Sequence, residues 1–474
     1  MNLLAFDLGA ESGRAVLGTL DGRRLRIEEL HRFANEPLRE GRQLRWNFPA
    51  LWDDVRLGLK RAESRPTLDG VGVDTWGVDY GLVDGDGQLV CSPIHYRDAR
   101  TDGVMDEVVA RVGRERLYGA TGVQFLPFNT LFQLVAHART DPDSLRRAHR
   151  LLFMPDLFAL MLSGEQRTEP TIASTSQMYD PLRHDWAREL LAELQIPFEL
   201  LPAIVPTGSA LRPDAPVIAV GHDTAAAVVA VPAGESANWC YISSGTWSLM
   251  GVERSEPIIN ADSLRHNFTN EVGFGRSIRF LRNIMGLWLV QESRREFARS
   301  GREFTYGELT ALAAGAECEA VIDPDHKPFL SPGEMPAKIE RFCRDSNQPA
   351  PADPGQIVRC CLESLALRYR RTLEHLEELT GQQIETIHIV GGGSQNELLN
   401  QMTADACART VVAGPAEATA IGNLLVQAIS VGAVASLAEA RRIVRESFDV
   451  KRFEPREPAA WDAKHARFRE VAGR

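Results

Sequence analysis

The sequence predicts an α/β protein with mixed sheets, built as two halves of similar design. Strands alternate with helices along the chain, which is typical of α/β architecture. Two glycine turns, Asp7–Arg14 and Ser243–Ser248, start 236 residues apart, and each joins one apolar strand to another. Pro and Gly residues in Val231–Glu235 lie almost at the midpoint. We therefore expect two domains, residues 1–234 and 235–474.

In the first half, apolar runs that end at turn residues mark the strands, and longer periodic segments mark the helices. The stretch from Leu3 is apolar up to Asp7, and another run closes through the turn Asp84–Gly87. We expect strands at Leu3–Leu8, Ala15–Leu20, Leu25–Phe33, Val71–Thr75, Val78–Val83 and Val217–Val220, and helices at about Pro49–Ala62, Val104–Val112, Asn129–Ala138, Asp156–Leu162 and Trp186–Leu194. An Ala/Val helix follows Thr224.

The second half restarts with a strand pair around the second glycine turn. A Pro-rich connector, Asn347–Pro354, precedes a long segment of alternating acids and bases, which predicts a helix. We expect the strand pair at Trp239–Val252, helices near Ile284–Ala298, Gly355–Leu379 and Asn396–Cys407, and a strand at Thr386–Val390 that ends on Gly391–Gly393.

Composition excludes several classes of function. The net charge is −11 and no block of Lys or Arg stands out, so we expect no nucleic-acid partner. No run of about 20 apolar residues is present, which argues against a membrane span. The N-terminus reaches Asp7 without a basic segment, so we expect no signal peptide and a cytoplasmic location. The seven scattered cysteines match no zinc spacing and are expected to be reduced packing thiols.

The two glycine turns predict a site for nucleotide phosphates. Small residues at a strand reversal leave backbone N–H groups and hydroxyls free to hold phosphate oxygens. None of the five lysines lies in a Walker loop, and no complete Gly-x-Gly-x-x-Gly opens a helix after the first strand. Backbone amides, hydroxyls and Mg²⁺ would therefore have to bind the phosphates.

Two aspartates at strand ends are candidates for metal binding and catalysis. Asp7 ends a buried strand beside the first turn, where a carboxylate can hold Mg²⁺ directly or through water; alternatively it caps its own turn. Asp223 follows the apolar strand Val217–Val220, where ligands gather in α/β folds, and it could accept a proton from a substrate hydroxyl. The alternative for Asp223 is a helix N-cap. His222 could contact substrate hydroxyls or be structural.

A third cluster, Val73–Tyr80, offers groups for sugar recognition. Gly77 allows close backbone approach, Trp76 could form a platform, and the two acids supply acceptors; alternatively Asp74 and Asp79 are solvated and Trp76 is core. Arg97 and Arg100 would add donors or form surface ion pairs. Asn283 and Gln291 offer amides at a predicted helix start, where Asn283 could equally be an N-cap.

Six blocks together resemble the FGGY carbohydrate kinases, and within them the members that phosphorylate L-rhamnulose. The blocks follow that family's order and span nearly the whole chain. They are Asp7–Arg14, Asp74–Asp79, His222–Thr224, Ser243–Gly251, Asn283–Trp288 and His388–Gly393.

The resemblance implies two actin/hexokinase-like lobes with ATP and sugar in a cleft between them. It implies that Asp223 is the base that activates the primary hydroxyl of L-rhamnulose, giving L-rhamnulose 1-phosphate and ADP, and that Asp7 serves the metal. ATP would contact Ala10, Glu11, Ser12, Gly13, Arg14, Gly245, Thr246, Gln291 and Gly392, and the sugar would contact Gly77, His222, Asp223, Thr224 and Asn283. Glu11 departs from the family pattern, which also admits Ser there. Disulfides of some relatives do not transfer, because Thr403 and Glu63 stand where those relatives have Cys.

Two other classes of function stay open from the sequence. One is a neighbouring kinase acting on fuculose, xylulose or glycerol. The other is a non-catalytic sugar or nucleotide sensor, or a chaperone-like ATPase on the same fold. A sensor would have no need of Asp223, and a chaperone would be expected to carry a peptide-binding extension that 474 residues leave no room for.

Overall fold

A computed structural model describes residues 1–65, 67–212, 215–234 and 238–472, and it divides into two compact units. Unit 1 comprises Met1–Gly234, Glu253–Leu281 and Ala418–Phe448, and unit 2 comprises Glu235–Val252, Arg282–Glu417 and Asp449–Arg474. Unit 1 thus includes two segments from the second half of the chain. The predicted boundary at 234/235 adjoins residues 235–237, which lie outside the described residues.

Unit 1 is organised around a six-stranded mixed sheet. Its strand order is β13-β14-β6-β1-β2-β3, and β1 pairs antiparallel with β2 but parallel with β6, which is parallel to β14. In parallel pairs the carboxyl ends of the strands meet at one edge. The strands are β1 (Asn2–Leu8), β2 (Ser12–Asp21), β3 (Arg24–Ala34), β6 (Gly70–Thr75), β13 (Ala210–Arg212) and β14 (Ala215–His222).

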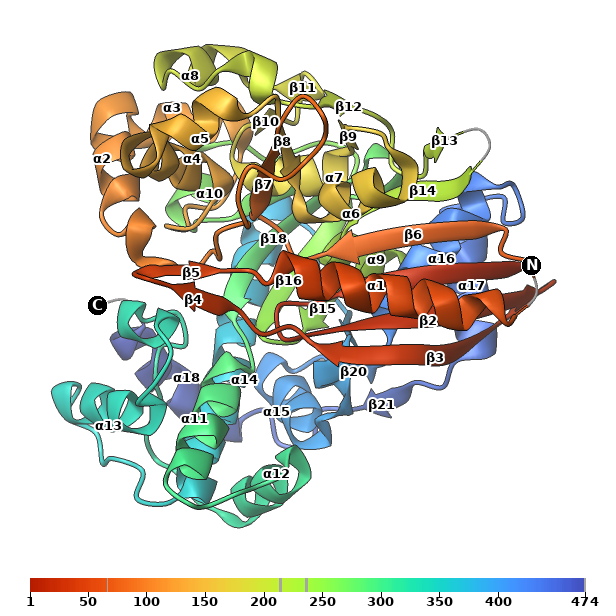
Figure 1. Ribbon diagram of the computed structural model, residues 1–474. Coiled ribbons are helices and arrows are strands. Elements are labelled where there is room, and N and C mark those ends of the chain that lie inside the picture. Colours follow the sequence, from red (N-terminus) through yellow and green to blue (C-terminus); the bar gives the residue numbers. More distant parts are fainter. Residues whose placement is uncertain (66, 213–214, 235–237, 473–474) are drawn as a thin grey trace. The chain divides into compact units, whose positions relative to one another are not determined.

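Helices cover both faces of this sheet (Figure 1). Helix α1 (Phe48–Glu63) packs on one face, where Leu4, Phe6 and Leu8 of β1 join its apolar side chains in one core. Helices α9 (Asp223–Val229) and α16 (Ala418–Ser430) pack on the strands as well, and Gln427 of α16 donates to Leu4 O at 3.0 Å. A strand buried on both sides needs a continuous apolar run, which explains the sequence of β1.

The rest of unit 1 forms a second hydrophobic core, built mainly from the helices between residues 104 and 200. The remaining helices of unit 1 are α2 (Val104–Val112), α3 (Arg114–Thr121), α4 (Thr130–Thr140), α5 (Pro142–Arg147), α6 (Met154–Ser163), α7 (Pro170–Ala173), α8 (Arg188–Glu193), α10 (Ala261–Arg265) and α17 (Leu437–Ser447). The smaller strands are β4 (Leu38–Glu40), β5 (Gln43–Arg45), β7 (Tyr80–Val83), β8 (Arg150–Phe153), β9 (Arg167–Thr168), β10 (Tyr179–Asp180), β11 (Asp185–Trp186), β12 (Ala203–Ile204) and β17 (Thr269–Val272).

Unit 2 repeats the pattern of a hairpin followed by two parallel strands. β15 (Trp239–Ser244) pairs antiparallel with β16 (Trp247–Arg254) and parallel with β19 (Thr386–Val390), which is parallel to β20 (Thr410–Ala413). The edge strand β21 (Lys451–Phe453) is antiparallel to β20. β16 and β18 (Ile278–Met285) have residues in both units. The helices are α11 (Trp288–Arg299), α12 (Tyr306–Gly315), α13 (Met335–Asp345), α14 (Pro354–Thr380), α15 (Glu397–Cys407) and α18 (Ala460–Val471).

Most predicted elements agree with the structure, and the differences have local causes. The helix expected from Ile284 begins only at Trp288, because the preceding residues continue β18. The strand expected from Val78 begins at Tyr80, because Val78 is left-handed, with φ 67°. Trp186 pairs with Tyr179 in a short hairpin rather than starting a helix. No helix in the described part of the chain is long and apolar enough to cross a membrane.

Candidate functional site

Three aspartates come together at the carboxyl edge of the unit 1 sheet. Asp7 and Asp74 are register partners on the parallel strands β1 and β6, and Asp223 directly follows β14, the next strand. Adjacent strands lie about 4.8 Å apart, so the three acids are close enough to influence one another's ionisation. The charge of Asp7 raises the pKa of both Asp74 and Asp223.

Asp7 is held by an arginine across the first hairpin. Arg14 donates to Asp7 Oδ2 through Nε at 3.0 Å and through Nη2 at 2.7 Å. No described backbone amide of the turn donates to this carboxylate, so the reading of Asp7 as a cap of its own loop is wrong. Arg14, which the sequence assigned to ATP, is an ion-pair partner of the predicted metal residue.

Asp74 is fully buried, and its hydrogen-bond donor lies on a helix from the far end of the chain. Asn423 of α16 donates to Asp74 Oδ2 at 2.6 Å, whereas Asp74 Oδ1 is buried with no hydrogen-bond partner among the described residues. Burial, and after it the charge of Asp7, raises the pKa of Asp74 well above its ordinary value. The expectation that Asp74 could be a solvated strand-end acid is wrong.

Asp223 is the most open of the three acids, with a quarter of its side chain exposed. Its Oδ1 accepts from Thr224 N at 2.5 Å and from Thr224 Oγ1 at 3.1 Å, and His222 Nε2 lies 3.3 Å away. Within the described residues, every hydrogen bond to Asp223 ends on Oδ1, so Oδ2 stays available to a ligand. Burial, followed by the charge of Asp7, raises the pKa of Asp223 to about 7. Asp223 is the first residue of α9, and the N-cap position belongs to His222.

His222 is buried beside Asp223 and is fixed at both ends. Its backbone N–H donates to Thr171 Oγ1 at 3.0 Å, and its Nδ1 lies 3.1 Å from Nη2 of Arg279. Burial, and then the charge of Arg279, lowers the pKa of His222 well below its ordinary value. The imidazole is therefore neutral near pH 7 and cannot supply a proton from a charged form.

The strand that carries His222 is shaped by a buried glutamate. The register of β14 on β6 shifts between Ala219 and Gly221, and Gly221 has φ 87°. A Cβ at Gly221 would overlap the carboxylate of Glu169, whose oxygens accept from Thr171 N at 3.0 Å and from Ile172 N at 2.8 Å. This bulge changes the direction of the chain and so determines the positions of His222 and Asp223.

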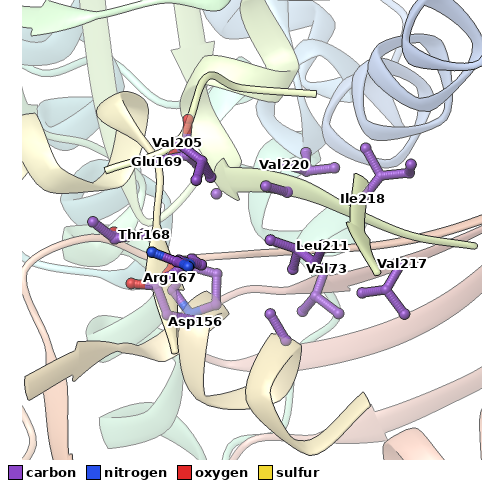
Figure 2. A pocket seen from close by; sticks show the side chains of 14 residues that line it. Val73, Asp156, Arg167, Thr168, Glu169, Val205, Leu211, Val217, Ile218 and Val220 are labelled. Carbon is purple, nitrogen blue, oxygen red and sulfur yellow. The ribbon is translucent and has the colours of Figure 1, made fainter. Parts of the chain in front are cut away.

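A narrow pocket lies behind this bulge and is separate from Asp7, Asp74 and Asp223. Figure 2 shows Asp156, Arg167, Thr168 and Glu169 at one end of it and valine, leucine and isoleucine side chains along β14 at the other. Burial raises the pKa of Asp156 well above its ordinary value. Asp7, Asp74 and Asp223 do not line the pocket, so its contents would bear on the fold of β14 rather than on the chemistry.

Gly77 and Val78 form a tight turn next to His222. A Cβ at Gly77 would lie 3.2 Å from Thr175 Oγ1 and 3.3 Å from His222 Nε2, closer than side chains ordinarily pack. Val78 adopts a left-handed backbone that is strained for a β-branched residue. Thr130 Oγ1 donates to Val78 O at 2.6 Å and Val78 N donates to Thr175 Oγ1 at 3.2 Å. Hydrogen bonds from neighbouring residues therefore hold the turn in this conformation.

Asp79 is buried under this turn, and its hydrogen bonds stabilise the surrounding structure. Its Oδ2 accepts from Trp46 Nε1 at 2.6 Å and Trp76 Nε1 at 3.1 Å, and its Oδ1 accepts from Gln133 Nε2 at 2.9 Å. Burial raises the pKa of Asp79 to about 6. Trp76 is only 5% exposed, so it belongs to the core and is not an open sugar platform. Arg100 donates to Gln133 Oε1 at 2.7 Å rather than to a surface ion pair.

The first glycine turn is a closed hairpin with an open tip. Gly9 N donates to Ser12 O at 2.9 Å, and Asn35 Nδ2 donates to Gly9 O at 2.9 Å. Ala10 and Glu11 are half-buried and Ser12 is exposed. Gly13 is buried, and a Cβ there would overlap the ring of Phe33. The turn therefore presents Ala10, Glu11 and Ser12 outward, while Gly13 is required by packing.

The second glycine turn, in unit 2, is closed in a similar way. Gly245 N donates to Trp247 O at 2.8 Å. The carbonyls of Gly245 and Thr246 accept from Leu287 N at 3.0 Å and from Gly286 N at 3.1 Å, just before α11. A Cβ at Gly286 would lie 2.6 Å from the backbone carbon of Trp247. Gly286 is therefore needed for this close approach.

Gln291 and Gly392 join this turn within unit 2. Gln291 lies one helical turn after Leu287, and its Oε1 is buried with no partner among the described residues. Gly391 and Gly393 pack on Ser244, a residue of the turn, whereas a Cβ at Gly392 would meet nothing within 4 Å. Within unit 2, the elements that carry Gly245, Thr246, Gln291 and Gly392 therefore adjoin one another.

The prediction that Asn283 stands at a helix start is wrong. Asn283 lies in β18, in the part that belongs to unit 2, and α11 begins five residues later. The strand is anchored there by Asp325, whose Oδ1 accepts from Met285 N at 2.9 Å.

Sequence reasoning missed several groups that hold the site. Arg279 and Glu271 contact His222, and Asn423 contacts Asp74. The alternation Ile278-Arg279-Phe280 is a strand signal that could have predicted β18, but a fully buried arginine breaks the polar-outward rule. Nothing local could connect residue 423 with residue 74.

Comparison with known proteins identifies the family. Residues 2–230 match the N-terminal domain, and residues 240–431 the C-terminal domain, of the FGGY family of carbohydrate kinases. The chain is 42% identical over 483 residues to a rhamnulokinase from Bacteroides thetaiotaomicron, covering 99% of each, and 38% identical over 460 residues to one from Oceanobacillus iheyensis, covering 94% of this chain and 97% of that relative.

Solved structures share the fold at low sequence identity. A gluconate kinase from Lactobacillus acidophilus superposes with a TM-score of 0.80 at 14% identity, covering 100% of this chain and 97% of that one. A glycerol kinase with ADP from Plasmodium falciparum superposes with a TM-score of 0.78 at 14% identity, with the same coverage. These matches confirm the actin/hexokinase-like α/β fold. By its two matched domains and its full-length relatives, the chain belongs to the FGGY family of carbohydrate kinases.

Proposed function

We propose that this kinase transfers the γ-phosphoryl group of ATP to the primary hydroxyl of L-rhamnulose, giving L-rhamnulose 1-phosphate and ADP, as a step in L-rhamnose degradation. Its relatives at 38–42% identity carry the name rhamnulokinase. The observation that carries the chemistry is Asp223, a partly exposed carboxylate with one oxygen that accepts no hydrogen bond from the residues that the structure describes.

Asp223 is assigned the role of general base. Its Oδ2 takes the proton of the sugar hydroxyl while that oxygen bonds to the γ-phosphorus and the bond from phosphorus to the β,γ-bridging oxygen breaks. Thr224 donates to Oδ1 through its backbone N–H and its hydroxyl and so orients the carboxylate, and His222 Nε2 lies 3.3 Å from the same oxygen. Gly77, which lies beside His222, and Asn283 are assigned to the sugar hydroxyls.

The nucleotide is assigned to the two glycine turns. In unit 2 the nucleotide is assigned to the exposed Gly392, to the turn Gly245-Thr246 and to Gln291, whose buried Oε1 has no hydrogen-bond partner among the described residues. In unit 1 the outward residues Ala10, Glu11 and Ser12 are assigned to phosphate, and Gly13 and Arg14 support them. Backbone N–H groups at such turns suit anions. The N-terminal FGGY domain, residues 1–234, would thus supply sugar contacts and the base, and residues 235–474 most nucleotide contacts.

The aspartates fit a hard divalent cation such as Mg²⁺, which would neutralise charge on the phosphates. The donor set is carboxylate oxygen, and Asp74 Oδ1 is buried with no hydrogen-bond partner in the described part of the chain. Among the described residues no three acidic, histidine or cysteine side chains form a ready metal cage, which suits an ion that takes one or two carboxylates plus phosphate oxygens. Asp7 is assigned to this ion.

Replacing Asp7 with Asn should raise the Mg²⁺ concentration needed for half-maximal activity, because one anionic ligand is lost. The measurement is a Mg²⁺ titration at saturating ATP and sugar, with the exposed Asp86→Asn variant as control. An unchanged Mg²⁺ requirement in Asp7→Asn would remove Asp7 from the metal site.

A cytoplasmic location is part of the proposal. All seven cysteines are free thiols in the structure, as expected for a reducing compartment.

The direct test of function is phosphoryl transfer to a panel of L-rhamnulose, L-fuculose, D-xylulose and glycerol, followed by coupled ADP detection. We expect the highest kcat/KM for L-rhamnulose and phosphate on its C1 oxygen by NMR. A higher kcat/KM for another member of the panel would reassign the substrate. ATP turnover at the same rate without sugar would favour a sensor or chaperone-like ATPase.

The sugar kcat/KM should rise with pH through about 7 and level off above it. The base must be ionised, and the pKa of Asp223 is raised to about 7 in the protein without ligands. Because kcat/KM reports the free enzyme, we expect a loss of about tenfold per pH unit below 7. A profile that is flat from pH 5.5 to 8 would contradict this assignment.

A further inference from the structure

The hydrogen bonds of Arg279 determine which nitrogen of His222 carries the proton. Arg279 is fully buried on β18, in the part that belongs to unit 1. Its Nε donates to Val272 O at 3.2 Å, and its Nη2 lies 2.9 Å from Glu271 Oε2 and 3.1 Å from His222 Nδ1. A guanidinium only donates hydrogen bonds. His222 Nδ1 must therefore be the acceptor, without a proton.

Glu271 does not offer a competing arrangement. Its Oε2 is 3.6 Å from His222 Nδ1, beyond hydrogen-bond distance, and already accepts from Arg279. The other charged group that faces the ring is Asp223, at the opposite nitrogen. Burial and the neighbouring guanidinium both lower the pKa of His222. A neutral ring with an unprotonated Nδ1 carries its hydrogen on Nε2.

That Nε2–H points to the place where chemistry is assigned. Nε2 lies 3.3 Å from Asp223 Oδ1 and borders the space beside Gly77, since a Cβ there would come within 3.3 Å of it. A neutral ring beside Oδ1 adds no positive charge that would lower the basicity of Asp223. The same N–H can reach a substrate oxygen next to the hydroxyl that Asp223 deprotonates.

We propose that Arg279, anchored by Glu271, is a positioning residue that holds His222 as the Nε2–H tautomer, so that His222 is a hydrogen-bond donor to the bound ketose beside Asp223. The part that concerns the ketose rests on the proposed function, but the tautomer does not. In this scheme no proton passes through His222, and its role is to orient one substrate oxygen next to the base.

The tautomer is tested on the intact protein without substrate. In histidine-¹⁵N-labelled protein, a long-range ¹H–¹⁵N correlation distinguishes protonated from unprotonated ring nitrogens, and the His222→Gln variant identifies the His222 signals by their loss. We expect a neutral ring with Nε2 protonated from pH 6 to 8. An Nδ1–H tautomer or an imidazolium would overturn the proposal, whichever sugar proves to be the substrate.

Two isosteric variants test the role of the donor. The amide nitrogen of Gln reaches the Nε2 position, whereas that of Asn reaches only the Nδ1 position. We expect His222→Asn to raise the sugar KM about tenfold more than His222→Gln does, because only His222→Asn loses the hydrogen bond. Equal losses in both variants would overturn the donor role.

The role of Arg279 needs a variant that does not strand a buried charge. Arg279→Met combined with Glu271→Gln removes both charges together. We expect the His222 signals in this variant to show a mixture of tautomers and the sugar KM to rise, whereas the exposed Arg265→Met control leaves both unchanged. A pure Nε2–H tautomer and an unchanged sugar KM would show that Arg279 is not the cause. If the double variant does not fold, the tautomer measured in the wild-type protein and the two isosteric variants still test the proposal.

Discussion

Replacing Asp223 with Asn is expected to lower kcat by about 100-fold to 10,000-fold, the usual contribution of a general base. Asn keeps the shape of the side chain and the hydrogen bonds to Thr224, but it cannot take the hydroxyl proton. Binding of ATP and sugar should survive, because the other assigned residues are untouched. Steady-state kinetics by coupled ADP detection and calorimetric titration of both ligands measure these two effects.

A measurement of the stability of Asp223→Asn distinguishes a loss of catalysis from a loss of folding. In the folded protein the pKa of Asp223 is raised to about 7, whereas the ordinary value is about 3.9. The folded state therefore binds more protons between these values, and stability falls as pH rises through that window. Asn removes this cost, so the thermal midpoint at pH 8 should equal or exceed that of wild type. Near-normal kcat would reject Asp223 as the base, and the Asp86→Asn variant should behave as wild type.

Replacing Gly422 with Ala is expected to lower the free energy of unfolding by about 3 kcal/mol or more, the range for overpacking a tight contact. Gly422 lies on α16, and a Cβ there would overlap the backbone carbonyl oxygen of Ala226 on α9. A backbone oxygen cannot rotate away, so the two helices must separate. Because α9 begins with Asp223 and α16 carries Asn423, activity should fall as well.

A matched substitution controls for the loss of glycine itself. Gly119 lies in α3, is exposed, and has no atom within 4 Å of an added Cβ. Gly119→Ala should raise the free energy of unfolding by about 0.5–1 kcal/mol, because Ala loses less backbone entropy in a helix. Thermal or urea unfolding of both variants makes the measurement. A Gly422→Ala protein as stable as Gly119→Ala would contradict the packing argument.

Elements with strong local signals were predictable from the sequence. The strand at Thr386–Val390 and the helix at Val104–Val112 have the expected bounds, because an apolar run or an apolar period coincided with clear end signals. Both glycine turns proved to be antiparallel hairpins next to a parallel strand. The prediction of a helix at 284–287 was wrong, because it followed the motif Asn283–Trp288 and not the periodicity of the apolar residues.

Side-chain environments were much harder to predict. Asp74, Asp79 and Trp76 could each be read as exposed or buried from sequence, and all three are buried. Their partners, Asn423 for Asp74 and Gln133 for Asp79, are far away in the chain. The sequence contains no local signal for such a pairing.

The sequence by itself determined the α/β class, the two glycine turns, the strand-end acids and, through its motifs, the family. These features are encoded locally, in apolar runs, glycines and short blocks. Tertiary structure alone decided that residues 418–448 complete the first unit, that three aspartates share one sheet edge, and that a buried arginine faces His222. The physical reason is that ionisation and tautomer depend on burial and on charges a few ångströms away, and those neighbours come from distant parts of the chain.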